Sequence, residues 1–172
     1  APAAVFHTQE ALTTAFREGR LDRDLVAVVR FQGPRATGMP ELHKLITPLS
    51  VSMDHGHRVA MVTDGRLSGA SGKVPAAIHV TPEALSGGPL GKVRPGDVSR
   101  LAAVAGTLDL LLDDETIATR EYADPGVRDV RYGAGRQIFA PLRGNLQSAE
   151  EGASSLFTYV HEKCEVHLPF EE

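Results

Sequence analysis

Apolar residues at the start of the chain follow two patterns, one with the spacing of a helix and one that is continuous. Helical spacing begins after Thr8, a favourable N-cap, and stops at Gly19, which predicts an amphipathic helix packed on a core. Two continuous apolar runs, 25–31 (LVAVVRF) and 59–62 (VAMV), predict buried strands. The chain therefore begins as helices that pack against strands.

Charged residues interrupt this part of the pattern at two places. Arg30 lies near the end of the first apolar run, where its side chain either extends to water or projects into a site at the end of the strand. The segment 39–41 (MPE) predicts the start of a second helix, because proline fits a first helical turn and an acidic residue suits the helix dipole. Glu41 is accordingly either a surface carboxylate of that helix or a ligand for a hard cation.

After Leu90 the pattern changes to short apolar segments joined by tight turns. The segments 91–93, 98–104 and 107–112 predict consecutive strands of a β-meander or barrel. Together with the helices expected before them, these strands indicate an α+β fold.

The last helical pattern lies near the end of the chain. Ser148 and Glu151 form a capping box in front of apolar residues at helical spacing, which predicts a closing helix. Those apolar residues are Ala153, Leu156, Phe157 and Val160. Residues 162–172 are polar and are expected to be a loosely ordered tail. We therefore expect one domain over residues 1–161, followed by this tail.

Composition narrows the classes of protein. The chain has 172 residues, enough for one domain with a sizeable core, and 42% of them are hydrophobic, as in ordinary soluble proteins. A formal net charge of −4 gives no broad basic field for nucleic acid. The longest apolar runs are too short to span a bilayer, and no signal peptide is recognisable, so a cytoplasmic location is expected. A single cysteine, Cys164, excludes an internal disulfide and cannot alone hold a metal cluster.

The densest candidate chemistry is the segment 63–74 (TDGRLSGASGKV), which follows the second apolar run. A loop of this composition at a strand end offers backbone N–H groups, hydroxyls and a cation to an anion or hydroxy substrate. The alternative is a flexible surface turn, because glycine-rich loops are common. The segment is neither a Walker A motif, since Val74 follows Lys73, nor a G-x-S-x-G nucleophile elbow.

Two long motifs resemble one enzyme family. The segments 28–45 (VVRFQGPRATGMPELHKL) and 63–84 (TDGRLSGASGKVPAAIHVTPEA) are similar to the dihydroxy-acid and 6-phosphogluconate dehydratase family, and closest to its 6-phosphogluconate dehydratase branch. The resemblance runs over about residues 5–157 and matches the C-terminal domain of these enzymes. It implies that an N-terminal domain with an iron–sulfur cluster is absent from this chain.

The resemblance also implies a reaction and roles for two residues. The family removes water from a 2,3-dihydroxy acid: the C2 proton is abstracted, the C3 hydroxyl leaves with help from the iron of the cluster, and a 2-keto-3-deoxy acid results. In related sugar-acid dehydratases the first serine of the central loop abstracts the proton as an alkoxide, which corresponds to Ser68. The acidic residue of the G-M-P-E motif is a magnesium ligand in related enzymes, which corresponds to Glu41.

Further residues are candidates for binding the substrate beside Ser68. Gly69 lets the backbone come close to the substrate. Ser71 and Lys73 are expected to contact substrate hydroxyls, carboxylate or phosphate, since an ammonium group is a natural phosphate partner. Arg30 and Arg66 are weaker candidates for the same role.

The resemblance implies a β-barrel with flanking helices, similar to the swivelling domain of aconitase-like enzymes. The implied cofactors are an iron–sulfur cluster, 4Fe–4S in type and held by the absent N-terminal domain, and Mg²⁺. The implied partners are a phosphosugar acid, the protein's own N-terminal domain and a second copy in a homodimer, with no nucleic acid and no membrane.

Three functions remain open. The first is the substrate-side domain of a dehydratase that acts on 6-phosphogluconate in the Entner–Doudoroff pathway, which Lys73 and the F-Q-G-P motif favour. The second is a domain of a dehydratase for dihydroxy acids or unphosphorylated sugar acids. The third is a noncatalytic domain that binds an anion with the same loop. A substrate preference that depends on phosphate would separate the first two.

Overall fold

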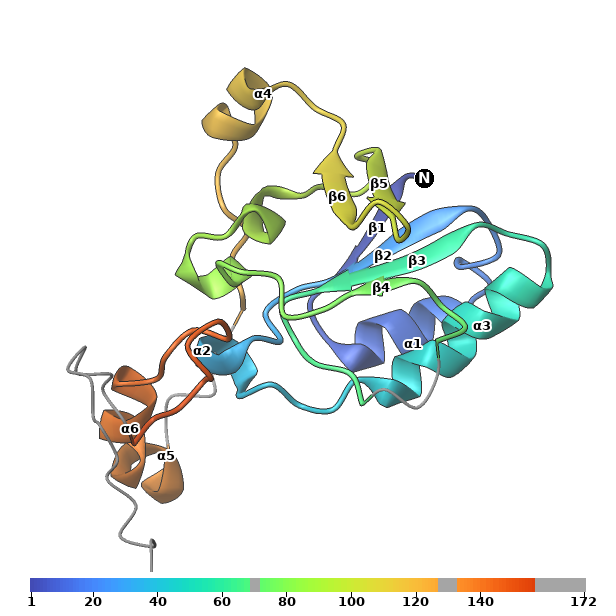
Figure 1. The fold of residues 1–172 in the computed structure, drawn as a ribbon. Coiled ribbons are helices and arrows are strands. Elements are labelled where there is room, and N and C mark those ends of the chain that lie inside the picture. Colours follow the sequence, from blue (N-terminus) through green and yellow to red (C-terminus); the bar gives the residue numbers. More distant parts are fainter. Residues whose placement is uncertain (69–71, 127–132, 157–172) are drawn as a thin grey trace, which may run out of the picture.

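A four-stranded parallel sheet lies at the centre of the computed structural model, which describes residues 1–68, 72–126 and 133–156 (Figure 1). Its strand order is β1-β2-β3-β4, and each strand runs parallel to its neighbour. A separate antiparallel pair, β5-β6, follows later in the chain. The strands are β1 (Ala3–Phe6), β2 (Leu25–Val29), β3 (Val59–Thr63), β4 (Ala76–Ala77), β5 (Ser99–Ala102) and β6 (Thr107–Leu110).

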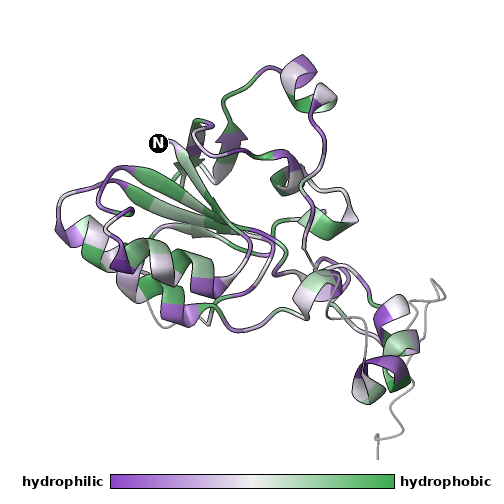
Figure 2. Ribbon diagram, turned by 180° about the vertical axis from the view of Figure 1, so that it is seen from behind, coloured by the Kyte–Doolittle hydropathy of each residue, from purple (hydrophilic) through white to green (hydrophobic). Residues whose placement is uncertain are grey.

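Two helices, α1 (Gln9–Arg17) and α3 (Ile46–Asp54), cover one face of this sheet (Figure 1). The predicted first helix is confirmed, with the Thr8 hydroxyl accepting the Ala11 N–H at 3.1 Å. Every second residue of β2 packs toward these helices, which gives a continuous core. Figure 2 shows hydrophobic residues concentrated on the strands, while the helices carry both polar and apolar residues.

The second helix begins later than the sequence predicts. A 3-10 turn, η1 (His43–Leu45), leads into α3, and Glu41 lies outside both elements. Glu41 instead pairs with Arg66 as an isolated parallel β-bridge. Its segment is therefore held in an extended conformation by the central loop, which is why the helix starts further along the chain.

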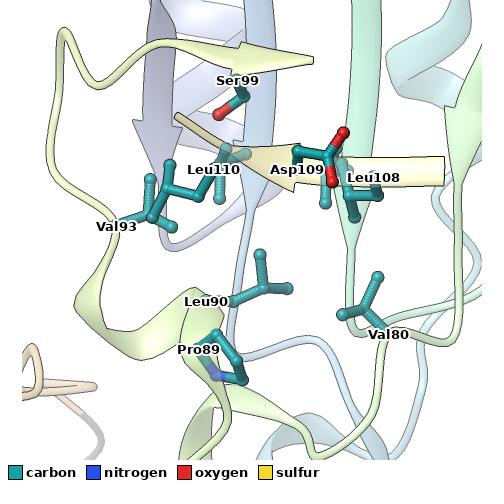
Figure 3. Close-up of a pocket in the computed structure, with 10 residues that line it drawn as sticks. Val80, Pro89, Leu90, Val93, Ser99, Leu108, Asp109 and Leu110 are labelled. Atoms are coloured by element: carbon teal, nitrogen blue, oxygen red, sulfur yellow. The ribbon is translucent and has the colours of Figure 1, made fainter. Parts of the chain in front are cut away.

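The other face of the sheet is covered by the segment 84–93 and by the β5-β6 hairpin. Between them and the sheet lies an apolar cavity of about 210 Å³ (Figure 3). Its lining residues are Val28, Val62, Val80, Pro89, Leu90, Val93, Ser99, Leu108, Asp109 and Leu110. None of them is a site residue predicted from the sequence.

The mixed helix and sheet content is as predicted, but the described residues form no closed barrel. The free edge of β1 is joined to the hairpin by an antiparallel bridge between Pro2 and Val98 and by the Ala3 N–H, which donates to the Asp97 carbonyl at 2.7 Å. Within the described residues β6 then pairs with β5 alone, and β4 contributes two residues to the sheet. The seam between β6 and β4 therefore stays open.

Two other predictions in the second half were wrong or fell partly outside the described residues. Residues 91–93 form no strand, because Pro89 starts a 3-10 turn, η3 (Pro89–Lys92). Ser148 and Glu151 make the hydrogen bonds of a capping box, yet residues 148–156 form no helix. The rest of the predicted closing helix and the tail at 162–172 lie outside the described residues.

The remaining elements are short. They are α2 (Pro34–Thr37), η2 (Ala84–Ser86), α4 (Asp114–Thr119), α5 (Ala134–Ile138) and α6 (Ala140–Gly144). Within the part of the chain that the structure describes, no helix is both long enough and apolar enough to cross a bilayer.

Candidate functional site

The candidate site lies where two neighbouring strands of the parallel sheet end. Strands β2 and β3 are paired in register, with Val29 opposite Thr63. Their following loops, 30–42 and 64–75, therefore leave the same edge of the sheet. The carboxyl edge of a parallel sheet is where α/β proteins commonly bind ligands.

Glu41 and Ser68, the proposed metal ligand and proposed base, come from different loops and are in direct contact. Glu41 Oε1 accepts hydrogen bonds from the backbone N–H groups of Ser68, at 2.9 Å, and His43, at 3.0 Å. Glu41 Oε2 accepts from Arg66 Nη1 at 2.9 Å. Arg66 Nε in turn donates to the Met39 carbonyl at 2.8 Å. The structure thus brings two predicted site residues together, with Arg66 between their loops.

The surroundings of Glu41 favour its charged form. The Ser68 backbone N–H is the largest cause that lowers the pKa of Glu41 below its usual value, and the His43 N–H and the Arg66 charge act in the same direction. The Ser68 side chain adds a smaller lowering contribution. Partial desolvation opposes them without reversing the direction. Glu41 is therefore a carboxylate at neutral pH.

The other predicted residues of the central loop are placed as follows. Ser68 itself is exposed at the strand-end edge. Gly69 and Ser71 lie outside the described residues. Lys73 Nζ donates to both carboxylate oxygens of Asp54, the last residue of α3, at 2.6 Å each. Its proposed contact with substrate stays a prediction.

Arg30 is buried, with 6% of its surface exposed, so the alternative that it reaches water is wrong. Its Nη1 donates to the carbonyls of Leu90, Gly91 and Val93, at 3.0, 3.3 and 2.8 Å. Its Nε and Nη2 lie 3.0 and 2.9 Å from His7 Nε2. Burial and the Arg30 charge lower the pKa of His7, which keeps its ring neutral and able to accept. In this arrangement Arg30 joins β2 to the segment that covers the sheet.

Two buried carboxylates that the sequence analysis did not select organise the loops around the site. Asp64 is fully buried and accepts the N–H groups of Phe31 at 3.1 Å, Gln32 at 2.9 Å and Ala84 at 2.9 Å. The signal that could have identified it is an aspartate placed directly after a buried strand, where an apolar residue would otherwise be expected.

Glu83 is the second buried carboxylate, with 4% of its surface exposed. It accepts the N–H groups of Arg35 at 3.0 Å and Ala36 at 3.3 Å, at the start of α2. Burial is the main cause that raises the pKa of Glu83. Local sequence does not mark its burial, which depends on contacts with a segment some fifty residues away.

Gly65 allows the two loops of the site to approach closely. A Cβ at this position would lie 2.7 Å from Gln32 Cβ and 2.9 Å from Leu42 Cδ1. Both distances are shorter than normal carbon contacts, so a side chain here would push the loops apart. The third residue of the T-D-G-R segment is therefore fixed as glycine by packing.

The described residues do not by themselves fit the implied metal centres. Among residues 1–68, 72–126 and 133–156, no group of three or more His, Cys, Asp or Glu side chains is arranged to hold a metal ion. Glu41 is one carboxylate, and its Oε2 faces a guanidinium group. Cys164 lies outside the described residues, and one cysteine cannot hold an iron–sulfur cluster.

Comparison with known proteins identifies relatives of this chain. A family model described as dihydroxy-acid/6-phosphogluconate dehydratase C-terminal matches residues 1–153. The phosphogluconate dehydratase of Pseudomonas aeruginosa is 57% identical over 155 residues, which cover 90% of this chain and 25% of that protein. The phosphogluconate dehydratase of Escherichia coli (strain K12) is 55% identical over 156 residues, which cover 91% and 26%.

A more distant relative carries a different name. The dihydroxy-acid dehydratase of Pyrococcus furiosus is 39% identical over 132 residues, which cover 75% of this chain and 23% of that protein. The chain therefore spans about a quarter of the length of the curated relatives that it matches.

Proposed function

This chain belongs to the dihydroxy-acid/6-phosphogluconate dehydratase family, and we propose that it is the C-terminal domain of a hydro-lyase. The proposed reaction is dehydration of 6-phospho-D-gluconate to 2-dehydro-3-deoxy-6-phospho-D-gluconate, in the Entner–Doudoroff pathway. The identities of 57% and 55% with phosphogluconate dehydratases, against 39% with a dihydroxy-acid dehydratase, support this substrate. The observation that carries the proposal is the contact between Ser68 and Glu41 at the sheet edge.

In the proposed reaction Ser68 is the base. As an alkoxide, its Oγ takes the proton from C2 of the substrate, and the electron pair of that C–H bond forms the C2=C3 double bond. The C3 hydroxyl leaves with its bonding pair and takes up the proton that Ser68 accepted, which gives water and restores the alkoxide, and the resulting enol tautomerises to the ketone. Backbone N–H groups of a glycine-containing loop are suited to stabilising negative charge at such a position.

The remaining residues of the central loop are proposed to bind the substrate. Gly69 and Ser71 would contact it next to Ser68, and Lys73 would hold its phosphate or carboxylate. Lys73 already holds an anion, the carboxylate of Asp54, so binding substrate would exchange one anion for another. Arg30 stays a proposed substrate contact of lower rank, since main-chain carbonyls and His7 already occupy its guanidinium.

We further propose an iron–sulfur cluster, 4Fe–4S in type, and Mg²⁺ as cofactors, with Glu41 as one ligand of the Mg²⁺. When bound, the cluster would act as a Lewis acid toward the leaving hydroxyl. Because the described residues supply no complete ligand set for either group, we derive no step through them. We propose that its partners are the protein's own N-terminal domain and a second copy, in a homodimer. We also propose a cytoplasmic location. For the fold, we propose that a barrel results when the open seam between β6 and β4 is closed.

The test is dehydration by the native protein that contains this chain. Formation of the 2-keto-3-deoxy product from 6-phosphogluconate, with little from gluconate or a branched-chain dihydroxy acid, is the expected result. Ser68→Ala should lower kcat by about 10²–10⁴-fold, the usual contribution of a positioned base, while the iron content is unchanged. Ser50→Ala, on α3, is the matched control and should leave kcat unchanged.

Other outcomes decide between the alternatives. Activity on an unphosphorylated or branched-chain dihydroxy acid alone would establish the second function. Wild-type kcat in Ser68→Ala would remove that residue from the reaction. Anion binding by the native protein without any dehydration would establish the noncatalytic function.

A further inference from the structure

We infer that Arg66 is a positioning residue, which fixes the main chain of Ser68 by holding Glu41. Two hydrogen bonds make the connection: Arg66 Nη1 lies 2.9 Å from Glu41 Oε2, and Ser68 N lies 2.9 Å from Glu41 Oε1. The same carboxylate therefore joins a guanidinium on one oxygen to the backbone of the proposed base on the other. The catalytic consequence rests on the proposed function, whereas the positioning itself does not.

The contacts of Arg66 and Ser68 with Glu41 join the start of the central loop to the neighbouring loop. Arg66 and Ser68 are two residues apart in the chain, and both bind Glu41 on the neighbouring loop. The Leu42 N–H donates to the Arg66 carbonyl at 3.3 Å, and Arg66 Nε donates to the Met39 carbonyl at 2.8 Å. The backbone of one loop is therefore bound on both sides of Glu41 by a single residue of the other. This arrangement restricts where Glu41 can point, and through it where Ser68 can lie.

These contacts orient Ser68 more than they stabilise the folded protein as a whole. The side chains of Arg66 and Glu41 are 48% and 35% exposed, and ion pairs with that much exposure contribute little to the free energy of unfolding. Their loss should therefore loosen the loop locally while the sheet and its core stay folded. This separation between local order and global stability makes the inference testable.

Arginine suits this position better than lysine would. Its planar group directs Nε to the Met39 carbonyl while Nη1 faces Glu41, so one side chain binds two groups of the opposite loop. The single ammonium of a lysine has no such fixed fork. We therefore expect Arg66→Lys to keep the charge beside Glu41 and to restore only part of the order.

Arg58 is a matched control in the same chain. Its Nε lies 2.8 Å from Asp24 Oδ2, and its backbone N–H donates to Asp24 Oδ1 at 2.9 Å. It forms an exposed ion pair next to strand β3, as Arg66 does, but at the amino end of the strand. A change there removes a similar pair far from Ser68.

The experiment measures solvent exchange of the Ser68 amide proton by NMR in the 172-residue chain. Arg66→Gln should accelerate exchange at Ser68 roughly tenfold, since its N–H would lose an oriented acceptor, and should leave the melting temperature nearly unchanged. Arg66→Lys should give an intermediate rate, and Arg58→Gln should leave the Ser68 rate at the wild-type value. An Arg66→Gln rate within twofold of wild type would overturn the inference. If Arg66→Gln does not fold, Arg66→Lys decides, because a wild-type rate in that variant would also overturn it.

Activity of the native protein provides a second readout. A positioning role predicts that Arg66→Gln lowers kcat with little change in KM, and that Arg66→Lys recovers part of kcat. A rise in KM at unchanged kcat would instead make Arg66 a substrate contact and overturn the inference. If the native protein shows no dehydration at all, the proposed function fails, and the exchange rate at Ser68 still decides the positioning role.

Discussion

Asp64→Asn is the substitution that most directly tests how the loops of the site are held. The Asp64 carboxylate has no exposed surface and accepts three backbone N–H groups, two on Oδ2 and one on Oδ1. Asparagine keeps the shape but has only one acceptor oxygen. In its better orientation the amide retains the two bonds of Oδ2 and turns its NH₂ group toward the Gln32 N–H. At least one donor is then buried against another donor.

The expected loss in the free energy of unfolding follows from the number of hydrogen bonds that the substitution removes. One charge-assisted bond is lost, and one buried N–H is left without an acceptor, so we expect a loss of about 2–4 kcal/mol in the free energy of unfolding. For a chain of this size such a loss lowers the melting temperature by roughly 10 °C. Urea unfolding of the 172-residue chain, followed by circular dichroism, measures the difference, with an unchanged m-value showing that the same surface is exposed.

Asp24→Asn is the matched control. Asp24 also accepts a backbone N–H, from Arg58 at 2.9 Å, but it lies at the surface, where water can replace a lost bond. Its substitution should therefore cost much less than Asp64→Asn. Equal losses for the two variants, or a loss below about 0.5 kcal/mol for Asp64→Asn, would refute the reasoning, since the latter is within the range of an ordinary surface change.

Two further predictions concern the same chain. Gly65→Ala should lower stability by about 1–3 kcal/mol, because the new Cβ would lie 2.7 Å from Gln32 Cβ, whereas Gly72→Ala, with open space around it, should have little effect in the same urea experiment. Asp97 has a lowered pKa, chiefly because Arg120 donates hydrogen bonds to it, so its contribution is present above its unfolded pKa of about 3.9 and is lost as pH falls through its folded value. Melting temperatures of wild type and Asp97→Asn should therefore differ at neutral pH and converge below about pH 4; a constant gap would contradict this sign.

Local pattern was enough to predict three main elements in the first half of the fold. The helix after Thr8 and the strands at β2 and β3 were all expected, because each carries its signal within a few residues. The location of Ser68 in a loop at a strand end followed from the same signal. Its contact with Glu41 does not follow from local pattern, because it is the parallel pairing of β2 with β3 that brings the two loops to one edge.

The predictions that failed depended on partners far along the chain. Arg30 sits in an apolar run, and nothing near it in sequence shows that carbonyls some sixty residues away surround its guanidinium. Within residues 148–156 the capping box at Ser148 forms its hydrogen bonds without a helix, because a cap contributes too little to make a helix stable without packing of an apolar face. The resemblance and the short strands after Leu90 led us to expect a barrel, but in the described residues β5 and β6 form a sheet of their own, and no local pattern encodes which strands pair.

The first four residues of the central loop, 63–66, each fix its backbone in a different way. Thr63 ends β3 with its hydroxyl accepting the Gly65 N–H at 2.9 Å, and Asp64 points inward to three N–H groups. Gly65 leaves room for the neighbouring loop, and Arg66 points outward to bind it. These four residues fix the backbone that leads to Ser68, whose N–H donates to Glu41. Each of the four residues acts on a different neighbour, so a change at any one of them should reach Ser68 through the backbone, by a different physical route in each case.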